Sequence, residues 1–177
     1  MIGNDVIDLE LAKTESNWQR KGWLEKIFTP SEQKIIADSE NQEIMVWLLW
    51  SMKESAYKIH HRNSKIRTYI PIRLICSDLR FKANFVFGKV SLNGIVFYTQ
   101  TTIGSDFVHT IATSHKKLFK KLNNYFSDSY NGVAMTENIY KDANGIPFLQ
   151  NKTTGKPKIL SIAHHGKFCS YISTKDL

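Results

Sequence analysis

The sequence contains little cysteine and no long hydrophobic segment. Cys76 and Cys169 are its two cysteines, and they lie far apart with no C-x-x-C pair. We therefore expect free thiols in a reducing compartment rather than a disulfide framework or a cysteine metal site. The longest apolar run, residues 44–50, is too short to cross a bilayer, and the N-terminus lacks the regions of a signal peptide. These absences predict a cytoplasmic protein without membrane attachment.

Acidic residues are also in short supply. The chain has 16 Asp and Glu against 24 Lys and Arg, which gives a net charge of +8. Such an excess favours anionic partners: nucleic acid, phosphorylated cofactors or an acidic protein. Because no RNP-type, zinc-finger or helix-turn-helix pattern occurs, we do not expect nucleic-acid binding. The length of 177 residues suffices for one large domain or two small packed subdomains.

Residues 46–58 give the clearest helical pattern. They contain no Gly or Pro and are rich in Leu, Met and Ala. At 3.6 residues per turn, Trp50, Glu54 and Lys58 share one face beside a broad apolar stripe. A Glu and a Lys at this spacing usually form an exposed ion pair of little energetic value. On a helix with so many apolar neighbours they would be partly buried, where a charge is costly unless a metal or partner compensates it.

The rest of the first 113 residues alternates between strand and helix patterns. A strand is expected at the N-terminus and a helix over 10–28. Thr29, Pro30 and Glu32 have the residue types of an N-cap, a first helical position and a capping box. An antiparallel sheet is then predicted from β-branched and aromatic segments, with a tight turn at Asn93-Gly94: 68–76, 82–87, 91–102 and 106–113.

The last third of the chain has weaker patterns. Residues 114–126 alternate lysines with apolar residues and predict a basic amphipathic helix. Residues 123–131 are polar and are the expected connector between two halves, and residues 159–172 predict a strand. His109, near the end of an apolar strand, is expected to be an ordinary packed histidine.

Three segments of the N-terminal part carry specific patterns: residues 3–6 (G-N-D-V), residues 28–32 (F-T-P-S-E) and residues 50–58 (W-S-M-K-E-S-A-Y-K). They resemble the G-x-D-[IV], F-[ST]-x-x-E and W-x-x-K-E-[AS]-x-x-K motifs of the 4′-phosphopantetheinyl transferases. Those enzymes move the phosphopantetheine arm of coenzyme A onto a serine of a carrier protein. Near the C-terminus, residues 162–166 (I-A-H-H-G) resemble the I-S-H-S-G strand of the same family.

The resemblance implies a magnesium-dependent transferase of the holo-[acyl-carrier-protein] synthase kind. Asp5 and Glu54 would hold the Mg²⁺, and Glu54 would also help to deprotonate the accepting serine. Lys58 would neutralise charge on the leaving phosphate. The residues expected to contact coenzyme A are His164, His165, Lys156 and Lys53. The partners implied are coenzyme A and an acyl or peptidyl carrier protein of fatty acid or polyketide biosynthesis.

The chain also departs from the family pattern. Ile7 stands where surfactin-type members have a second acid, and whether Asp8 replaces it is open because strand side chains alternate. Ala163 stands where a serine is usual. The phosphate-binding G-K-P element corresponds either to residues 145–147, with isoleucine in place of lysine, or to residues 155–157. These departures keep an alternative open: a degenerate member that binds coenzyme A or a carrier protein without catalysis.

The order of the motifs predicts the architecture. Surfactin-type transferases have the G-K-P and S-H-S-G motifs first, whereas this chain has them last. The resemblance therefore implies an α+β fold of two similar subdomains about a pseudo-twofold axis, circularly permuted and monomeric. Each subdomain would have a small, mainly antiparallel sheet with packed helices. Residues 1–115 would carry the metal site and residues 116–177 the coenzyme A phosphate contacts. The alternative is the small trimeric synthase with a long insertion between its motifs.

Overall fold

The computed structural model describes residues 1–129, 138–150 and 154–175. The first part of the chain forms β1 (Ile2–Asp8), α1 (Leu9–Glu15), α2 (Trp23–Ile27), α3 (Pro30–Ala37), α4 (Gln42–Ser64), the 3₁₀ helix η1 (Pro71–Arg73), β2 (Ile75–Lys82), β3 (Phe85–Leu92), β4 (Ile95–Ile103) and β5 (Phe107–Thr113). The second part forms the 3₁₀ helix η2 (Lys116–Lys121), β6 (Leu122–Ser127), β7 (Ile139–Lys141), β8 (Pro147–Gln150), β9 (Pro157–His165) and β10 (Phe168–Thr174).

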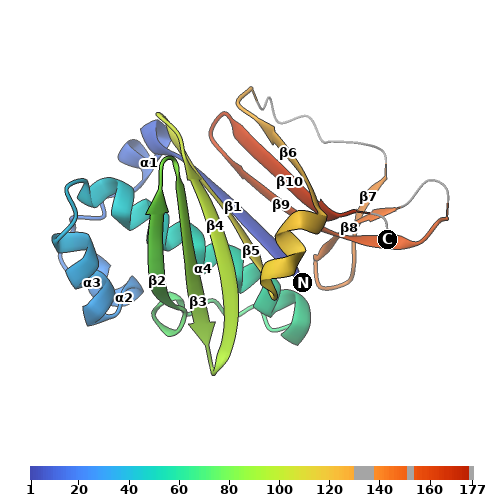
Figure 1. Ribbon diagram of the computed structural model, residues 1–177, viewed down its shortest axis with the longest axis horizontal. Coiled ribbons are helices and arrows are strands. Elements are labelled where there is room, and N and C mark those ends of the chain that lie inside the picture. Colours follow the sequence, from blue (N-terminus) through green and yellow to red (C-terminus); the bar gives the residue numbers. More distant parts are fainter. Residues whose placement is uncertain (130–137, 151–153, 176–177) are drawn as a thin grey trace.

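The strands of the described residues form two antiparallel sheets that lie side by side (Figure 1). The strand order is β1-β5-β4-β3-β2 in the first sheet and β6-β10-β9-β8-β7 in the second. Helices α1 to α4 all belong to the first sheet's part of the chain. The α+β class expected from the sequence is confirmed, with two subdomains that each contain a sheet, as in a phosphopantetheinyl-transferase-like fold.

Helix α4 provides the centre of the core, as residues 46–58 predicted. It begins at the N-cap Asn41, whose side chain accepts a hydrogen bond from the Ile44 amide. Its apolar stripe packs on the first sheet, and Leu48, Leu49 and Met52 are fully buried there. Each such side chain contributes roughly 1.5–3 kcal/mol through removal of apolar surface from water. The helix is therefore fixed firmly against β1 and β5, which it contacts along its length.

Strand β1 joins the two sheets. Its side chains alternate, so that Gly3, Asp5 and Ile7 face α4, whereas Asn4 and Val6 face the second sheet. The Asn4 amide group donates to both the carbonyl and the hydroxyl of Ser170 in β10, at 3.1 Å each. A single strand thus carries one row of residues into each half of the molecule.

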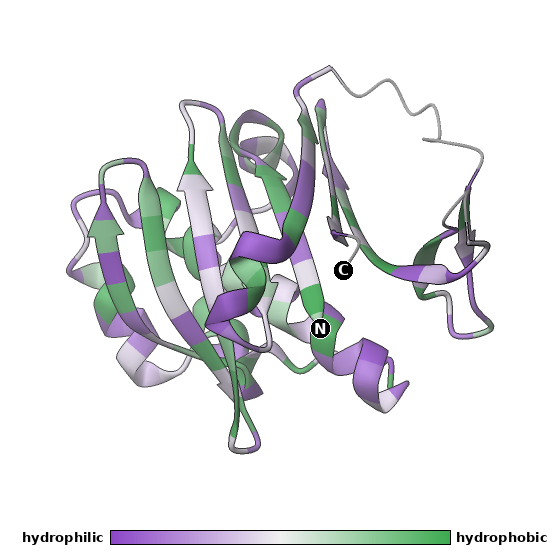
Figure 2. Ribbon diagram, turned by 45° about the vertical axis from the view of Figure 1, so that its right-hand side comes forward, coloured by the Kyte–Doolittle hydropathy of each residue, from purple (hydrophilic) through white to green (hydrophobic). Residues whose placement is uncertain are grey.

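Several local predictions are confirmed. Thr29 caps α3, and the complete capping box with Glu32 is present. Asn93 and Gly94 both have positive φ, as a tight hairpin turn between β3 and β4 requires. His109 is packed between the sheets, with its Nε2 2.8 Å from the Ser170 hydroxyl. Figure 2 shows hydrophobic and hydrophilic residues alternating along the strands of the first sheet. None of the described helices is long and apolar enough to span a bilayer.

Other boundaries differ from the expectation. The helix expected over 10–28 ends at Glu15 and resumes as α2 after Gly22, which has a positive φ. The segment 68–76 is mostly η1 and extended chain, with β2 beginning only at Ile75.

The helix predicted over 114–126 is wrong. The connector predicted over 123–131 begins in a strand, and its residues 130 and 131 lie outside the described residues. Residues 116–121 form the short 3₁₀ helix η2, and Leu122–Ser127 form strand β6, which pairs with β10. The aromatic residues of this segment favour a strand once a partner strand is present. Phe126 packs on Phe107, Phe168 and the His109 ring, so tertiary contacts decided the local structure.

Candidate active site

The close approach of β1 and α4 creates the site. A Cβ at Gly3 would lie 2.1 Å from the Ser55 carbonyl oxygen and 3.2 Å from the Lys58 Cβ. Only glycine therefore allows the helix to lie this close to the strand. Asp5 follows two residues later on the same side of the strand. The glycine of the G-N-D-V segment thus has a physical role: it brings the Asp5 carboxylate against the helix face that carries Glu54 and Lys58.

Asp5 and Glu54 form a desolvated pair of carboxyl groups. Asp5 Oδ2 is buried and makes no hydrogen bond to any described residue. Burial raises the pKa of Asp5, and the nearby Lys58 and Ser51 only partly oppose this shift. Burial and the charge of Asp5 together raise the pKa of Glu54 to about 7. Two carboxylates in one dry site destabilise each other, so the pair is arranged to accept a positive charge.

Lys58 lies at the seam between the two sheets. Its Nζ is 3.8 Å from Asp5 Oδ1, and it donates hydrogen bonds to the carbonyls of Asn4 in β1 (2.6 Å) and Ile162 in β9 (3.1 Å). Three polar groups from two sheets therefore hold one ammonium in place. A charge held this way can act on a ligand without first reorganising.

The donor set of this pair fits a hard divalent cation. Mg²⁺ is bound by one or two carboxylates together with substrate phosphate oxygens and waters, and the unpartnered Asp5 Oδ2 beside Glu54 supplies such oxygens. The described residues contain no cluster of three or more His, Cys, Asp or Glu side chains that could hold a metal by themselves. A cation here would depend on its substrate for further ligands.

A basic cavity of about 510 Å³ adjoins the carboxylate pair through Lys58. Its walls come from both sheets and from α4, and its basic residues are Lys58, His61, Arg62, Arg67, Lys141 and His164. The volume lies within the usual range for ligand sites. The shape and charge therefore suit a large, multiply anionic molecule.

The cations in this cavity repel each other. Burial lowers the pKa of His61, and the charges of Arg67, Lys65 and Arg62 lower it further. Arg62 is almost completely buried, and its Nη2 donates to the Pro147 carbonyl at 3.0 Å and to the Leu160 carbonyl. Its Nη1 and His61 Nε2 have no hydrogen-bond partner among the described residues. An anionic ligand would relieve the repulsion and satisfy these donors.

The C-terminal residues expected at the site are divided by the structure. His164 is exposed and lines the basic cavity. His165 points elsewhere: its Nδ1 accepts from the Asp8 amide at 2.8 Å, and its Nε2 lies 3.1 Å from Glu15 Oε2. Residues 145–147 line the cavity, whereas Lys156 is exposed and is not part of its lining. Of the two alternatives for the G-K-P element, the geometry favours residues 145–147.

Asp8 has a different task from the one left open by the sequence. Its Oδ1 accepts from the amides of Glu10 and Leu11 and so caps helix α1. Its Oδ2 accepts from the Lys167 amide at 3.2 Å. Ile7 faces the core beside α4. The carboxylates next to Lys58 are therefore Asp5 and Glu54, and Asp8 lies outside this group.

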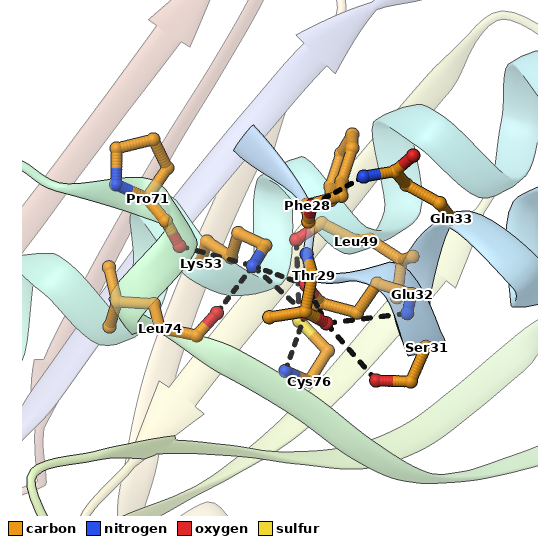
Figure 3. A network of polar contacts seen from close by, with 10 residues as sticks. All are labelled: Phe28, Thr29, Ser31, Glu32, Gln33, Leu49, Lys53, Pro71, Leu74 and Cys76. Atoms are coloured by element: carbon orange, nitrogen blue, oxygen red, sulfur yellow. Dashed lines mark hydrogen bonds and ion pairs between the residues drawn. The ribbon is translucent and has the colours of Figure 1, made fainter. Parts of the chain in front are cut away.

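Lys53 is placed in a buried network, not in the cavity wall (Figure 3). Its side chain is 0% exposed, and its ammonium lies 2.8 Å from Glu32 Oε1. It also donates to the carbonyls of Pro71 (3.1 Å) and Leu74. Glu32 Oε1 in turn accepts from the Cys76 amide at 2.7 Å. These bonds use the three donors of the lysine and tie α3, α4 and the start of β2 together.

Sequence analysis did not single out several cavity residues. His61 and Arg62 lie three and four residues after Lys58, so the helical period places them near the same face, but it did not indicate a role for them in the site. Arg67 and Lys141 carry no local signal, because only the fold brings the segments around them to the cavity.

Comparison with known families agrees with this geometry. The family model described as 4′-phosphopantetheinyl transferase superfamily matches residues 1–112, which include Asp5, Glu54 and Lys58. A search of curated proteins found no match. The matched region covers more than half of the 177-residue chain and contains the three segments whose resemblance the sequence revealed. The chain therefore belongs to the 4′-phosphopantetheinyl transferase superfamily.

Proposed function

We propose that this protein transfers the 4′-phosphopantetheine group of coenzyme A to a serine of an acyl or peptidyl carrier protein, with Mg²⁺ as cofactor and 3′,5′-ADP as the second product. Membership of the superfamily supports phosphopantetheine transfer in general. The observation that carries the specific proposal is the desolvated carboxylate pair of Asp5 and Glu54 beside the basic cavity. A bound Mg²⁺ would balance the negative charge of the two carboxylates, and the anionic substrate would balance the positive charge of the basic cavity.

The reaction joins the serine oxygen to the β-phosphorus of the diphosphate and breaks the bond from that phosphorus to the bridging oxygen. The electron pair of the broken bond stays with the leaving 3′,5′-ADP. A bound Mg²⁺ would supply positive charge to the phosphate oxygens. Lys58, held by two carbonyls, neutralises charge that develops on the leaving phosphate. Glu54, with a pKa of about 7, accepts the serine proton directly or through a water.

Binding of coenzyme A falls to the basic residues that line the cavity. Arg62 and His61 have buried, unpartnered nitrogens, and Arg67 and His164 lie on the same walls. Together they fit the three phosphates of the substrate through charge-assisted hydrogen bonds. The excess of basic residues over the whole chain also favours encounter with an acidic carrier protein. Both substrates are consistent with a cytoplasmic enzyme.

We further propose that the two halves follow the permuted order of a surfactin-type transferase, with residues 1–115 as the metal-binding half and residues 116–177 as the half that contacts the coenzyme A phosphates. The break between the sheets, from Thr113 to Leu122, supports a boundary here. The contact of Lys58 with both β1 and β9 supports a site between two halves of one chain, and hence a monomer. Light scattering that gave a trimer would favour the small-synthase architecture.

The decisive experiment is to incubate the protein with coenzyme A, Mg²⁺ and an apo carrier protein, and to weigh the carrier by mass spectrometry. We expect the mass of the carrier to increase by one phosphopantetheine group, and we expect EDTA to prevent this. Absence of a mass gain with acyl and peptidyl carriers, together with retained coenzyme A binding, would instead identify a binding protein without catalysis. The departures from the family motifs at Ile7, Ala163 and Ile146 motivate that second outcome.

A further inference from the structure

Tyr69 belongs to none of the sequence motifs, yet it lies over the catalytic face of α4. Its ring centroid is 6.0 Å from that of Trp50, at right angles, and 4.7 Å from that of Tyr57. Trp50 is four residues before Glu54 and Tyr57 is three residues after it, so all three share one face of the helix. The phenol ring therefore covers the part of α4 from which Glu54 projects.

The hydroxyl of Tyr69 interacts with the Glu54 carboxylate. It is buried and has no hydrogen bond of ordinary geometry to any described residue. A phenol carries its proton at neutral pH and can donate a hydrogen bond. A buried hydroxyl is destabilising unless it finds an acceptor. The Glu54 carboxylate, with which it interacts most directly, is the acceptor that the geometry provides.

The chain on both sides of Tyr69 is fixed. Before it, the Arg67 carbonyl accepts a hydrogen bond from the Tyr57 hydroxyl at 2.6 Å. After it, the Pro71 carbonyl accepts from the buried Lys53 ammonium at 3.1 Å, which Glu32 holds in place (Figure 3). This segment, residues 65–74, is otherwise mostly exposed. A segment with little burial of its own is thus pinned two residues before and two residues after the tyrosine.

We propose that Tyr69 is a positioning residue of the metal site, which donates its hydroxyl to Glu54 and holds that carboxylate facing Asp5. The buried Glu32–Lys53 pair then has a functional purpose, since it anchors the segment that carries Tyr69. The proposal rests on the proposed function, because it assumes that Asp5 and Glu54 hold a cation. Partners that orient a ligating carboxylate commonly affect metal affinity although they do not touch the metal.

The test uses Tyr69→Phe, which keeps the ring and its contacts with Trp50 and Tyr57 and removes only the hydroxyl. Mn²⁺ is added to the purified protein, and the free ion is measured by electron paramagnetic resonance. We expect the Kd for Mn²⁺ to rise about tenfold, while the Tm of the metal-free protein changes little because the ring and its contacts with Trp50 and Tyr57 are kept. Tyr125→Phe, on an exposed residue of β6, is the matched control and should bind Mn²⁺ like the wild type.

Equal Mn²⁺ affinity of Tyr69→Phe and the wild type, within twofold, would overturn the proposal. A fall in Tm that accounts for the loss of affinity would also overturn it, because the role would then be structural. Failure of the proposed function looks different: the wild type would bind Mn²⁺ and coenzyme A but leave every apo carrier unmodified. In that case the difference in Mn²⁺ affinity between Tyr69→Phe and the wild type would still decide the role of Tyr69.

Discussion

Replacing Lys53 by methionine tests the buried network most directly. Methionine has a similar length and shape, so Lys53→Met mainly removes the ammonium. The side chain is 0% exposed and its partner Glu32 is 1% exposed. The substitution leaves the Glu32 carboxylate in a dry environment, where it keeps the amides of Thr29 (2.8 Å) and Cys76 (2.7 Å) as donors but loses its only ionic partner among the described residues. The carbonyls of Pro71 and Leu74 lose their donor as well.

The expected cost follows from this geometry. Removal of one member of a buried ion pair typically destabilises a protein by about 3–5 kcal/mol, since the other charge stays buried. The remaining amide donors to Glu32 place the value near the lower end, at about 3 kcal/mol. For a chain of this length the corresponding decrease in Tm is roughly 10 °C. This is a large share of the total, because domains are stable by only about 5–15 kcal/mol.

Urea unfolding of wild type and Lys53→Met, followed by tryptophan fluorescence, measures the free-energy difference. Lys34→Met is the matched control: Lys34 forms an ion pair with Asp38 at 3.0 Å, but the two side chains are 77% and 62% exposed. Its loss should cost less than about 0.5 kcal/mol. A double-mutant cycle with Glu32→Gln should show a coupling of about 2 kcal/mol. If Lys53→Met and Lys34→Met were equally stable, the argument from burial would be refuted.

Three further predictions concern charge in the site and between the sheets. Glu54→Gln should abolish transfer in the carrier mass assay, and normal turnover would contradict the assignment of Glu54. Because the raised pKa of Glu54 makes the metal-free wild type lose stability as pH rises from 4.5 to about 7, Glu54→Gln should also be more stable than the wild type at pH 8, by about 3 kcal/mol. Lys58→Ala should lower the rate of phosphopantetheine transfer about 100-fold but weaken coenzyme A binding, measured by calorimetry, less than tenfold. A larger loss of coenzyme A affinity than of transfer rate would make Lys58 a binding residue. Burial lowers the pKa of His109 to about 4, whereas the pKa of an unfolded histidine is about 6.5. Between these two values the unfolded state binds more protons, so the stability should fall by about 1.4 kcal/mol for each unit by which the pH is lowered. His109→Gln should flatten this slope in urea titrations, and an unchanged slope would argue against a neutral, buried imidazole.

The fold around α4 could be predicted because its signals are local. The helix over residues 46–58, the capping box of Thr29 and Glu32, and the Asn93-Gly94 turn each depend on residues a few positions apart. The spacing of Glu54 and Lys58 on one helical face also follows from the period alone. Even here the sequence did not predict every contact. Glu32 closes the capping box with one carboxylate oxygen, but it also accepts a hydrogen bond from the distant Cys76 amide with the other.

The segment 114–126 shows why other elements could not be predicted. Its lysines and apolar residues recur at helical spacing, but Leu122–Ser127 lies beside β10, which is more than forty residues further along the chain. Pairing with that distant strand supplies backbone hydrogen bonds and partly buries Phe126, and these contacts outweigh a weak local helical preference.

What the sequence by itself determined is the set of chemical groups and their local order: the acid of the first strand, the acid and the base of the helix, and the glycine that lets strand and helix approach. What only the tertiary structure decided is their environment. Lys58 reaches the carbonyl of Ile162, 104 positions away, and the basic cavity takes residues from α4, from the segment after it and from the second sheet. Burial, which raises the pKa values of both carboxyl groups, arises only when these distant segments exclude water from the same place.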